Sequence, residues 1–297
     1  MINDKYRLLT GQGFDAQWQS AVNNNDDVFV ISVIGNSRVG KSLIAKAFSL
    51  ENENSPTAAP PEVDDLLVST TGNIGCYESR NMSEGTSKTL VLDYEGEDSG
   101  LPLMLRLRRH MHGSDKQNER RKFVKESFSK LAYILGNIVI LVGKDELNNF
   151  SYVERCSKFA KRAAAGVKDC EHLPVLIIIQ NMSMSQTKCN SDLLIARFLE
   201  CHGNSMNMME LYTYFSDIFC FRLPITSNQT WDKVTGKFGS QIFQDNIDLL
   251  KTKIKEIYHQ HVQQQRLITH MQWLFMMDSV LETVSDGGTV SLVILLA

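Results

Sequence analysis

The sequence predicts an α/β fold in which helices flank a mostly parallel sheet. From residue 28 onward, short apolar runs rich in β-branched residues alternate with longer amphipathic stretches, which is the pattern of parallel strands joined by crossover helices. A glycine-containing turn at 35–42 lies between the first such strand and the first helix. The chain length of 297 residues suits one large α/β domain, or a smaller domain with a helical appendage.

Six apolar runs are predicted as the strands of this sheet. Polar or glycine-containing segments bound them, and the spacing of the last three leaves room for helices between them. The stretch 42–50, which follows the turn after the first run, is predicted as a helix. The six runs cover residues 28–34, 72–79, 88–94, 137–143, 174–180 and 217–224.

The C-terminal part of the sequence is predicted to be helical from about residue 240 to about 284. Ile, Leu and aromatic side chains recur there at three- and four-residue steps without Pro or Gly, as in amphipathic helices. We therefore expect two parts, an α/β domain over 1–240 and a helical extension over 241–297. The last run, VSLVILLA at 290–297, is far shorter than the ~20 apolar residues that span a bilayer, and it is expected to be a core strand or a truncated boundary.

Composition and charge exclude several classes of protein. A formal net charge of −3 gives no reason to expect a nucleic-acid partner. Two short basic runs, at 106–110 and 119–122, are expected on solvated helix faces beside a loop, with an electrostatic patch for anionic lipid at a membrane surface or for a partner as the alternative. The six cysteines have neither zinc-site nor disulfide-framework spacing, and the N-terminus has no apolar address segment. A cytoplasmic location is therefore expected.

The turn at 35–42 has the sequence GNSRVGKS and fits the pattern G-x-x-x-x-G-K-[ST] in full. Its glycines let backbone N–H groups wrap around a phosphate, its lysine meets the β and γ phosphates, and its serine hydroxyl reaches Mg²⁺. The helix N-terminus adds a positive dipole end. A P-loop NTPase is therefore predicted, with a nucleoside triphosphate as its ligand. The expected nucleotide-binding residues of this turn are Gly35, Asn36, Ser37, Arg38, Val39, Gly40, Lys41, Ser42 and Leu43.

A second phosphate motif is predicted at the end of the third strand. Asp93 closes an apolar run and Gly96 follows three residues later. The carboxylate of Asp93 is expected to join Ser42 in a Mg²⁺ site, and the Gly96 N–H to face a γ phosphate. This D-x-x-G pattern favours a phosphate-hydrolysing switch over a P-loop kinase.

Together the two motifs carry a resemblance to a known family. An arginine inside the P-loop, Arg38, combined with a D-x-E-G that contains Glu95, resembles the guanylate-binding protein and atlastin group of the dynamin superfamily of large GTPases. The nucleotide-binding domain of the double-FYVE protein is a similar relative. By order of elements the resemblance covers roughly residues 20–240, but only the two phosphate motifs are specific.

The resemblance implies roles for particular residues. Arg38 would be a catalytic finger supplied from the same chain, swung inward when two such domains pair across the nucleotide, and Glu95 would help to hold the attacking water. It also implies a homodimer through the nucleotide face and Mg²⁺ as cofactor. Arg38 as an exposed loop residue and Glu95 as a surface carboxylate are the alternatives.

The sequence departs from the family pattern at two places. Where relatives have a Mg²⁺-binding threonine, this chain has TTGNIGCY, so that either Thr71 or Asn73 is the expected metal ligand. After the fifth strand, GTPases have N-K-x-D or an Arg-Asp pair that binds guanine, whereas this chain has Gln180 and Asn181. An asparagine has one acceptor oxygen and one amine, so it cannot accept both guanine donors as an aspartate does. GTP and ATP therefore both remain expected ligands.

The function predicted from the sequence is binding and hydrolysis of a nucleoside triphosphate, with GTP favoured by the resemblance and ATP as the alternative. A scaffold that binds nucleotide and dimerises but hydrolyses little is the second hypothesis. The motif residues that are present favour the enzyme.

Overall fold

The computed structural model describes the central sheet and most of its helices. The ranges it describes are 26–49, 74–79, 87–94, 96, 115–147, 154, 156–158, 160–161, 167–168, 173–225, 231–232, 237–238, 240–285 and 290–291.

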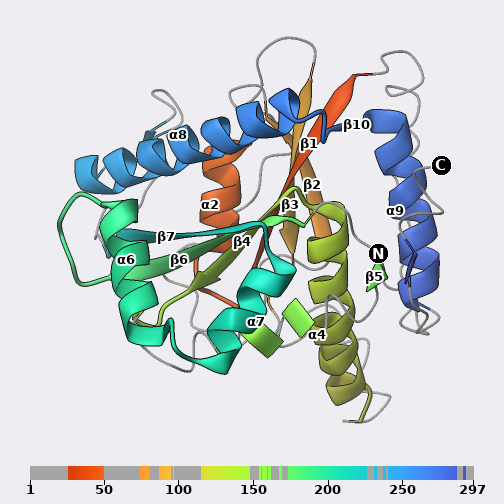
Figure 1. Ribbon diagram of the computed structural model, residues 1–297, viewed down its shortest axis with the longest axis horizontal. Coiled ribbons are helices and arrows are strands. Elements are labelled where there is room, and N and C mark those ends of the chain that lie inside the picture. Colours follow the sequence, from red (N-terminus) through yellow and green to blue (C-terminus); the bar gives the residue numbers. More distant parts are fainter. Residues whose placement is uncertain are drawn as a thin grey trace.

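A seven-stranded, mostly parallel sheet forms the centre of the described structure (Figure 1). Only β2 at one edge and the short β10, which extends the sheet beside β1, are antiparallel to their neighbours. The sheet order is β2 (Ile74–Ser79), β3 (Lys88–Tyr94), β1 (Asp27–Gly35), β4 (Ile138–Gly143), β6 (Val175–Ser183) and β7 (Asp217–Pro224), and β10 is Ile268–Thr269.

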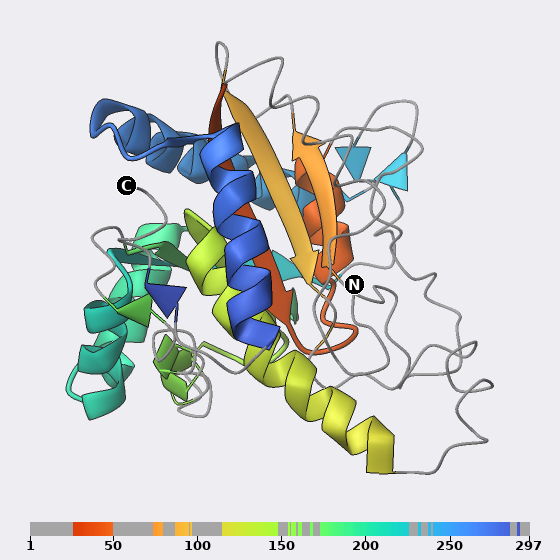
Figure 2. The same ribbon diagram turned by 90° about the vertical axis from the view of Figure 1, so that its right-hand side faces the viewer.

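Helices cover both faces of this sheet. One face carries α2 (Lys41–Phe48) and α8 (Gln241–Gln263). The other carries α4 (Asp115–Leu135), α6 (Ser191–His202), α7 (Met206–Tyr214) and α9 (His270–Ser285), and Figure 2 shows this face with α9 and α4 in front of the strands. Two small two-stranded sheets lie apart: β5 (Val167–Lys168) with β11 (Val290–Ser291), and β8 (Trp231–Asp232) with β9 (Lys237–Phe238). The predicted α/β class is confirmed.

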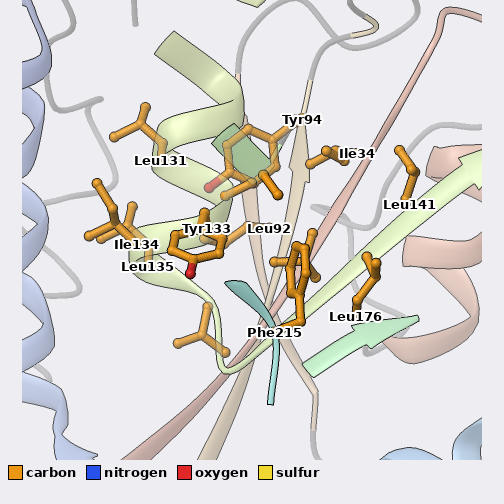
Figure 3. Packing of buried hydrophobic residues seen from close by; sticks show 14 of the residues in the cluster. Ile34, Leu92, Tyr94, Leu131, Tyr133, Ile134, Leu135, Leu141, Leu176 and Phe215 are labelled. Atoms are coloured by element: carbon orange, nitrogen blue, oxygen red, sulfur yellow. The ribbon is translucent and has the colours of Figure 1, made fainter. Parts of the chain in front are cut away.

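The hydrophobic core consists of two layers because strand residues alternate between the two faces of the sheet. In β1, for example, Phe29 and Ile31 face α2 and α8, whereas Val30 and Ile34 face the opposite layer. Figure 3 shows part of that second layer, where α4 packs on the sheet. Buried polar groups link the layer together, since Trp273 Nε1 of α9 donates to the carbonyl of Leu135 at the end of α4, at 3.2 Å.

The C-terminal part differs in one respect from the sequence prediction. A continuous helix was expected to about residue 284, but α8 ends at Gln263 and α9 begins at His270. Between them Gln265 has a φ of 53°, and Ile268 and Thr269 pair with the start of β1. Backbone pairing to a distant strand therefore overrides the local helical pattern. The division of the chain at residue 240 stays a prediction, and both C-terminal helices pack on the same sheet as the rest.

His270, the first residue of α9, is expected to make the stability of the protein depend on pH. Its backbone N–H donates to the carbonyl of Asp26 at 2.8 Å, and its side chain is fully buried and lies near the ring of Trp273. Burial, together with the nearby charge of Lys88, lowers the pKa of His270 to about 4, while Asp26 acts in the opposite direction. The folded protein therefore disfavours the protonated ring.

We expect the free energy of unfolding to fall as the pH drops through the window between the unfolded pKa of ~6.5 and about 4. The loss due to this one group is expected to be on the order of 2 kcal/mol. Urea unfolding at a series of pH values would measure it, and His270→Leu should flatten the decline whereas the exposed His259→Leu should not. An equal decline in wild type and His270→Leu would contradict the assignment.

Candidate nucleotide-binding site

The P-loop lies between the end of β1 and the start of α2, where the sequence predicts it. Both of its glycines are required by geometry. Gly35 has a φ of 147°, and a Cβ there would lie 2.2 Å from the carbonyl oxygen of Val142 in β4. Gly40 has a φ of 88°, and a Cβ there would lie 2.2 Å from Nδ2 of Asn181 in β6. Any side chain at these positions would push the loop away from the strands that support it.

Arg38 stands at the middle of the loop in a conformation unusual for its residue type. Its φ is 58°, in the left-handed region that non-glycine residues rarely occupy, and its side chain is half-buried. Strained backbone of this kind costs about 1 kcal/mol or more and persists where the surroundings impose it, often at functional sites.

Lys41, the first residue of α2, is buried against the loop. Its Nζ donates to the carbonyl oxygen of Asn36 at 2.7 Å, so the ammonium lies inside the turn. The first N–H groups of a helix lack intrahelical acceptors and carry the positive end of the helix dipole. No acidic residue lies in the first turn of α2 to offset this charge. The site is therefore suited to an anion such as a phosphate.

Ser42 and Asp93 form a buried pair beside the loop. The hydroxyl of Ser42 donates to Oδ2 of Asp93 at 2.7 Å, and both side chains are less than a tenth exposed. Asp93 is also close enough to Tyr77 to help raise the pKa of that phenol, although burial is the larger cause. A hydroxyl and a carboxylate are hard oxygen donors of the kind Mg²⁺ prefers.

This pair fits a Mg²⁺ site in which the phosphates of a bound nucleotide supply some of the metal ligands. Within the ranges that the structure describes, no three His, Cys, Asp or Glu side chains gather as a metal cluster. Mg²⁺ is commonly held by one or two protein oxygens together with waters and substrate phosphates rather than by an all-protein cage. The Ser42–Asp93 arrangement, next to the N-terminus of α2, matches that mode.

Gly96 lies directly against the P-loop. A Cβ at this position would be 2.5 Å from Cα of Ser37 and 2.6 Å from its backbone nitrogen. The structure thus brings the second predicted motif to the first, and only a glycine allows so close an approach. Thr71, Asn73 and Glu95 lie outside the described residues, so their predicted roles stay predictions.

Asn181 joins the end of β6 to the P-loop. It is fully buried, and its Nδ2 donates to the carbonyl of Val39 at 2.8 Å. Its neighbour Gln180 accepts a hydrogen bond at Oε1 from Nε of Arg222 in β7, at 3.2 Å. The two side chains predicted to meet the base are thus each held by a polar contact within the protein.

Two residues of this site were not predicted from the sequence. Val142 sets the requirement for glycine at position 35, and nothing in an apolar strand distinguishes it. Arg222 orients Gln180, and the sequence did contain a signal for it, since it is the one charged residue inside the apolar run FCFRLP. A charge within an otherwise apolar strand usually has a partner.

The chain has distant similarity to solved structures. No family model matches the chain, and no curated protein sequence matches it. Among solved structures, a mutation variant of SsGBP is 13% identical, with a TM-score of 0.40, over 85% of this chain and 65% of that one. The Arl6 (BBS3) small GTPase from Trypanosoma brucei, solved with the nucleotide analogue GppNp, is 10% identical, with a TM-score of 0.37, over 78% of this chain and 98% of that one.

The chain thus spans somewhat less than two thirds of the SsGBP chain. The predicted α/β fold, with the P-loop between β1 and α2, is confirmed by the chain's own sheet and helices, whereas the assignment to the guanylate-binding protein and atlastin group stays a prediction. None of the helices in the described ranges is both long and apolar enough to cross a bilayer.

Proposed function

We propose that this protein binds a nucleoside triphosphate together with Mg²⁺ and hydrolyses its γ phosphate. The observation that carries the proposal is the convergence of Lys41, the Ser42–Asp93 pair and Gly96 at the start of α2. Two parts of the chain, the start of α2 and the end of β3 with the residues just beyond it, contribute these groups, and a glycine turn with an exposed lysine would require none of these contacts.

Each group has a role that its chemistry supports. The Lys41 ammonium and the N–H groups of the loop oppose the charge of the β and γ phosphates. Ser42 and Asp93 hold Mg²⁺, whose bound charge offsets that of the phosphates. Arg38 stabilises the charge that develops on the phosphoryl oxygens during transfer, and Glu95 helps to position the attacking water.

The family resemblance favours guanine as the base, and the presence of Gln180 and Asn181 in place of the guanine-binding motif leaves adenine as the alternative. A second function, a nucleotide-gated scaffold with little hydrolysis, is supported by the replacement of the base-binding aspartate. Single-turnover hydrolysis distinguishes the two functions, because the scaffold would bind triphosphate without cleaving it.

Titration calorimetry of the whole chain with triphosphates and diphosphates, in Mg²⁺ and in EDTA, tests the proposal. Asp93→Asn is expected to lower triphosphate affinity in Mg²⁺ by about tenfold or more, because the amide is a poorer ligand of the metal. Diphosphate binding should fall much less. Asp145→Asn, an exposed carboxylate just beyond β4, is the matched control. Equal losses for the two nucleotides would assign Asp93 a structural role.

Pairing through the nucleotide face is part of the same proposal. An arginine in the P-loop needs an event that moves it inward, and dimerisation supplies that event while excluding water from the phosphates. Light scattering should therefore show a doubled mass with diphosphate plus a transition-state mimic of the γ phosphate. An unchanged mass under these conditions would count against pairing. Association with a membrane surface stays a prediction.

A further inference from the structure

Tyr77 lies in β2, the antiparallel strand at the edge of the sheet, and has no part in the function proposed above. Its register partner is Val91 of β3. The side chain of Tyr77 is half-buried and packs on the core layer that α2 and α8 cover, to which Val91 also belongs. Tyr77 therefore lies on the face of the sheet that carries α2, the helix that begins at the P-loop.

The phenol of Tyr77 leans along β2 toward the end of the strand nearest the phosphate motifs. A Cβ built on Gly75 would lie 2.5 Å from the hydroxyl oxygen of Tyr77 and 2.8 Å from its Cζ, so the ring occupies the space that a side chain at position 75 would fill. Gly75 is the register partner of Asp93. Residues directly opposite each other in an antiparallel pair project from the same face, with Cβ atoms about 5 Å apart. The hydroxyl of Tyr77 therefore lies beside the position from which the Asp93 side chain projects.

The charge of Asp93 acts on this phenol. Burial is the largest cause that raises the pKa of Tyr77, and the carboxylate of Asp93 is the second. The hydroxyl therefore stays protonated at neutral pH, and it is both a donor and an acceptor of hydrogen bonds. Ser42, and not Tyr77, donates to Oδ2 of Asp93, so the phenol is a neighbour of the Ser42–Asp93 pair that leaves this bond intact.

The waters of a Mg²⁺ ion held by this pair would need acceptors nearby. Mg²⁺ prefers six oxygen ligands and usually keeps several waters, because proteins supply only one or two of its ligands. A bound cation polarises these waters, which makes them strong hydrogen-bond donors. A neutral phenol is a poor direct ligand for Mg²⁺ beside a carboxylate, but its oxygen is a suitable acceptor for such a water.

We propose that Tyr77 is a positioning residue of the Mg²⁺ site, and that its phenol oxygen accepts a hydrogen bond from a metal-bound water beside Asp93. This rests on the function proposed above and adds a residue to it. Asp93 provides the negative charge that attracts the ion, whereas Tyr77 orients part of its water shell. Groups that act on a metal through its ligands typically contribute about 10- to 100-fold to metal affinity.

Calorimetry of the whole chain with a non-hydrolysable triphosphate, in Mg²⁺ and in EDTA, tests this inference. The ratio of the two dissociation constants measures how much the metal adds to binding. Tyr77→Phe keeps the ring over Gly75 and removes the hydroxyl, so we expect the ratio to fall about tenfold while the affinity in EDTA stays unchanged. Tyr258→Phe is the matched control, because it removes a phenol of the same core layer that donates to Ser87 at 2.9 Å. The ratio should not change in this control.

The possible outcomes separate this inference from the function on which it rests. An unchanged ratio in Tyr77→Phe would overturn the inference and leave the Mg²⁺-dependent binding of the wild type intact. Equal losses of affinity in Mg²⁺ and in EDTA would also overturn it, because the phenol would then contact the phosphates and not the water shell. No difference between Mg²⁺ and EDTA in the wild type would instead refute the metal site itself.

A second variant displaces the phenol without removing it. Gly75→Ala would place a methyl group 2.5 Å from the hydroxyl oxygen of Tyr77, so the ring would have to turn away from Asp93. We expect the ratio to fall about tenfold again, with no further fall in the double variant Gly75→Ala/Tyr77→Phe, because both changes remove the same contact. Thermal unfolding checks that each variant is folded. Losses that multiply in the double variant would show that the two residues act separately and would contradict the assignment.

Discussion

Lys41→Ala is expected to abolish triphosphate binding, with an affinity loss of about a hundredfold or more, because a buried charge-assisted contact to phosphate is lost. The ammonium lies inside the turn, 2.7 Å from the carbonyl of Asn36, and a phosphate would compete for it there. No other basic residue of the described P-loop and α2 lies inside the turn in this way. Titration with a fluorescent triphosphate measures the loss.

The matched control is Lys46→Ala. It removes the same charge from α2 about one turn further on, in the last turn of the helix. A cation there interacts favourably with the negative end of the helix dipole and is not placed to bind a phosphate. Its affinity should stay within a few-fold of wild type. If Lys41→Ala binds as tightly as wild type, the P-loop does not hold the phosphates.

Arg38→Ala is expected to lower the single-turnover rate by about 10³-fold, the lower end of the effect of arginine fingers, and to leave nucleotide affinity within a few-fold. A group that acts on the transition state alone changes kcat and not ground-state binding. Arg38→Lys should rescue poorly, because an ammonium cannot reproduce the planar fork that meets two oxygens. Rates are measured with saturating nucleotide, and equal rates for all variants would remove Arg38 from the mechanism.

The backbone at Arg38 provides a second, independent variant. With a φ of 58°, the position suits glycine better than any other residue, so Arg38→Gly should stabilise the fold slightly. If the guanidinium is what matters, Arg38→Gly and Arg38→Ala should lose the same activity while differing in thermal stability. A normal rate in Arg38→Gly would show that Arg38→Ala had failed through its backbone. No measurable rate in the wild type would favour the scaffold.

Much of the fold could be predicted from the sequence because its strands are apolar on both faces. Runs such as IVILVG and VLIIIQ have no polar alternation, which is typical of strands buried between two layers of helices. The P-loop could be predicted because its pattern is local and each position has a physical requirement. The sequence predicted that Gly96 and the P-loop face the same phosphate, and this implied that the two motifs lie close together.

The remainder depends on contacts between residues far apart in the chain. Asn181 and Val39 are 142 positions apart, and no local pattern indicates that an amide at the end of one strand will hold a loop beyond another. The end of α8 was missed for the same reason, because its cause is the pairing of Ile268 and Thr269 with the start of β1. Hydrophobic periodicity is a property of one segment of the chain, whereas each of these contacts joins two segments that are far apart in the sequence.

The pairing of β10 with β1 also has a practical consequence. β1 has nine residues and therefore measures about 30 Å, with the P-loop at its end and β10, next to α9, at its start. Because β1 pairs with β3 from Val28 to Val33 and with β4 from Ile31 to Gly35, it cannot slide without breaking both ladders. The N-terminal end of α9 is thus a fixed reference point within the molecule. A fluorophore attached at the exposed Phe275 of α9 could be paired with a second fluorophore on another molecule that binds the protein. A change in the distance between the two would then report movement of the bound molecule, because α9 stays in place.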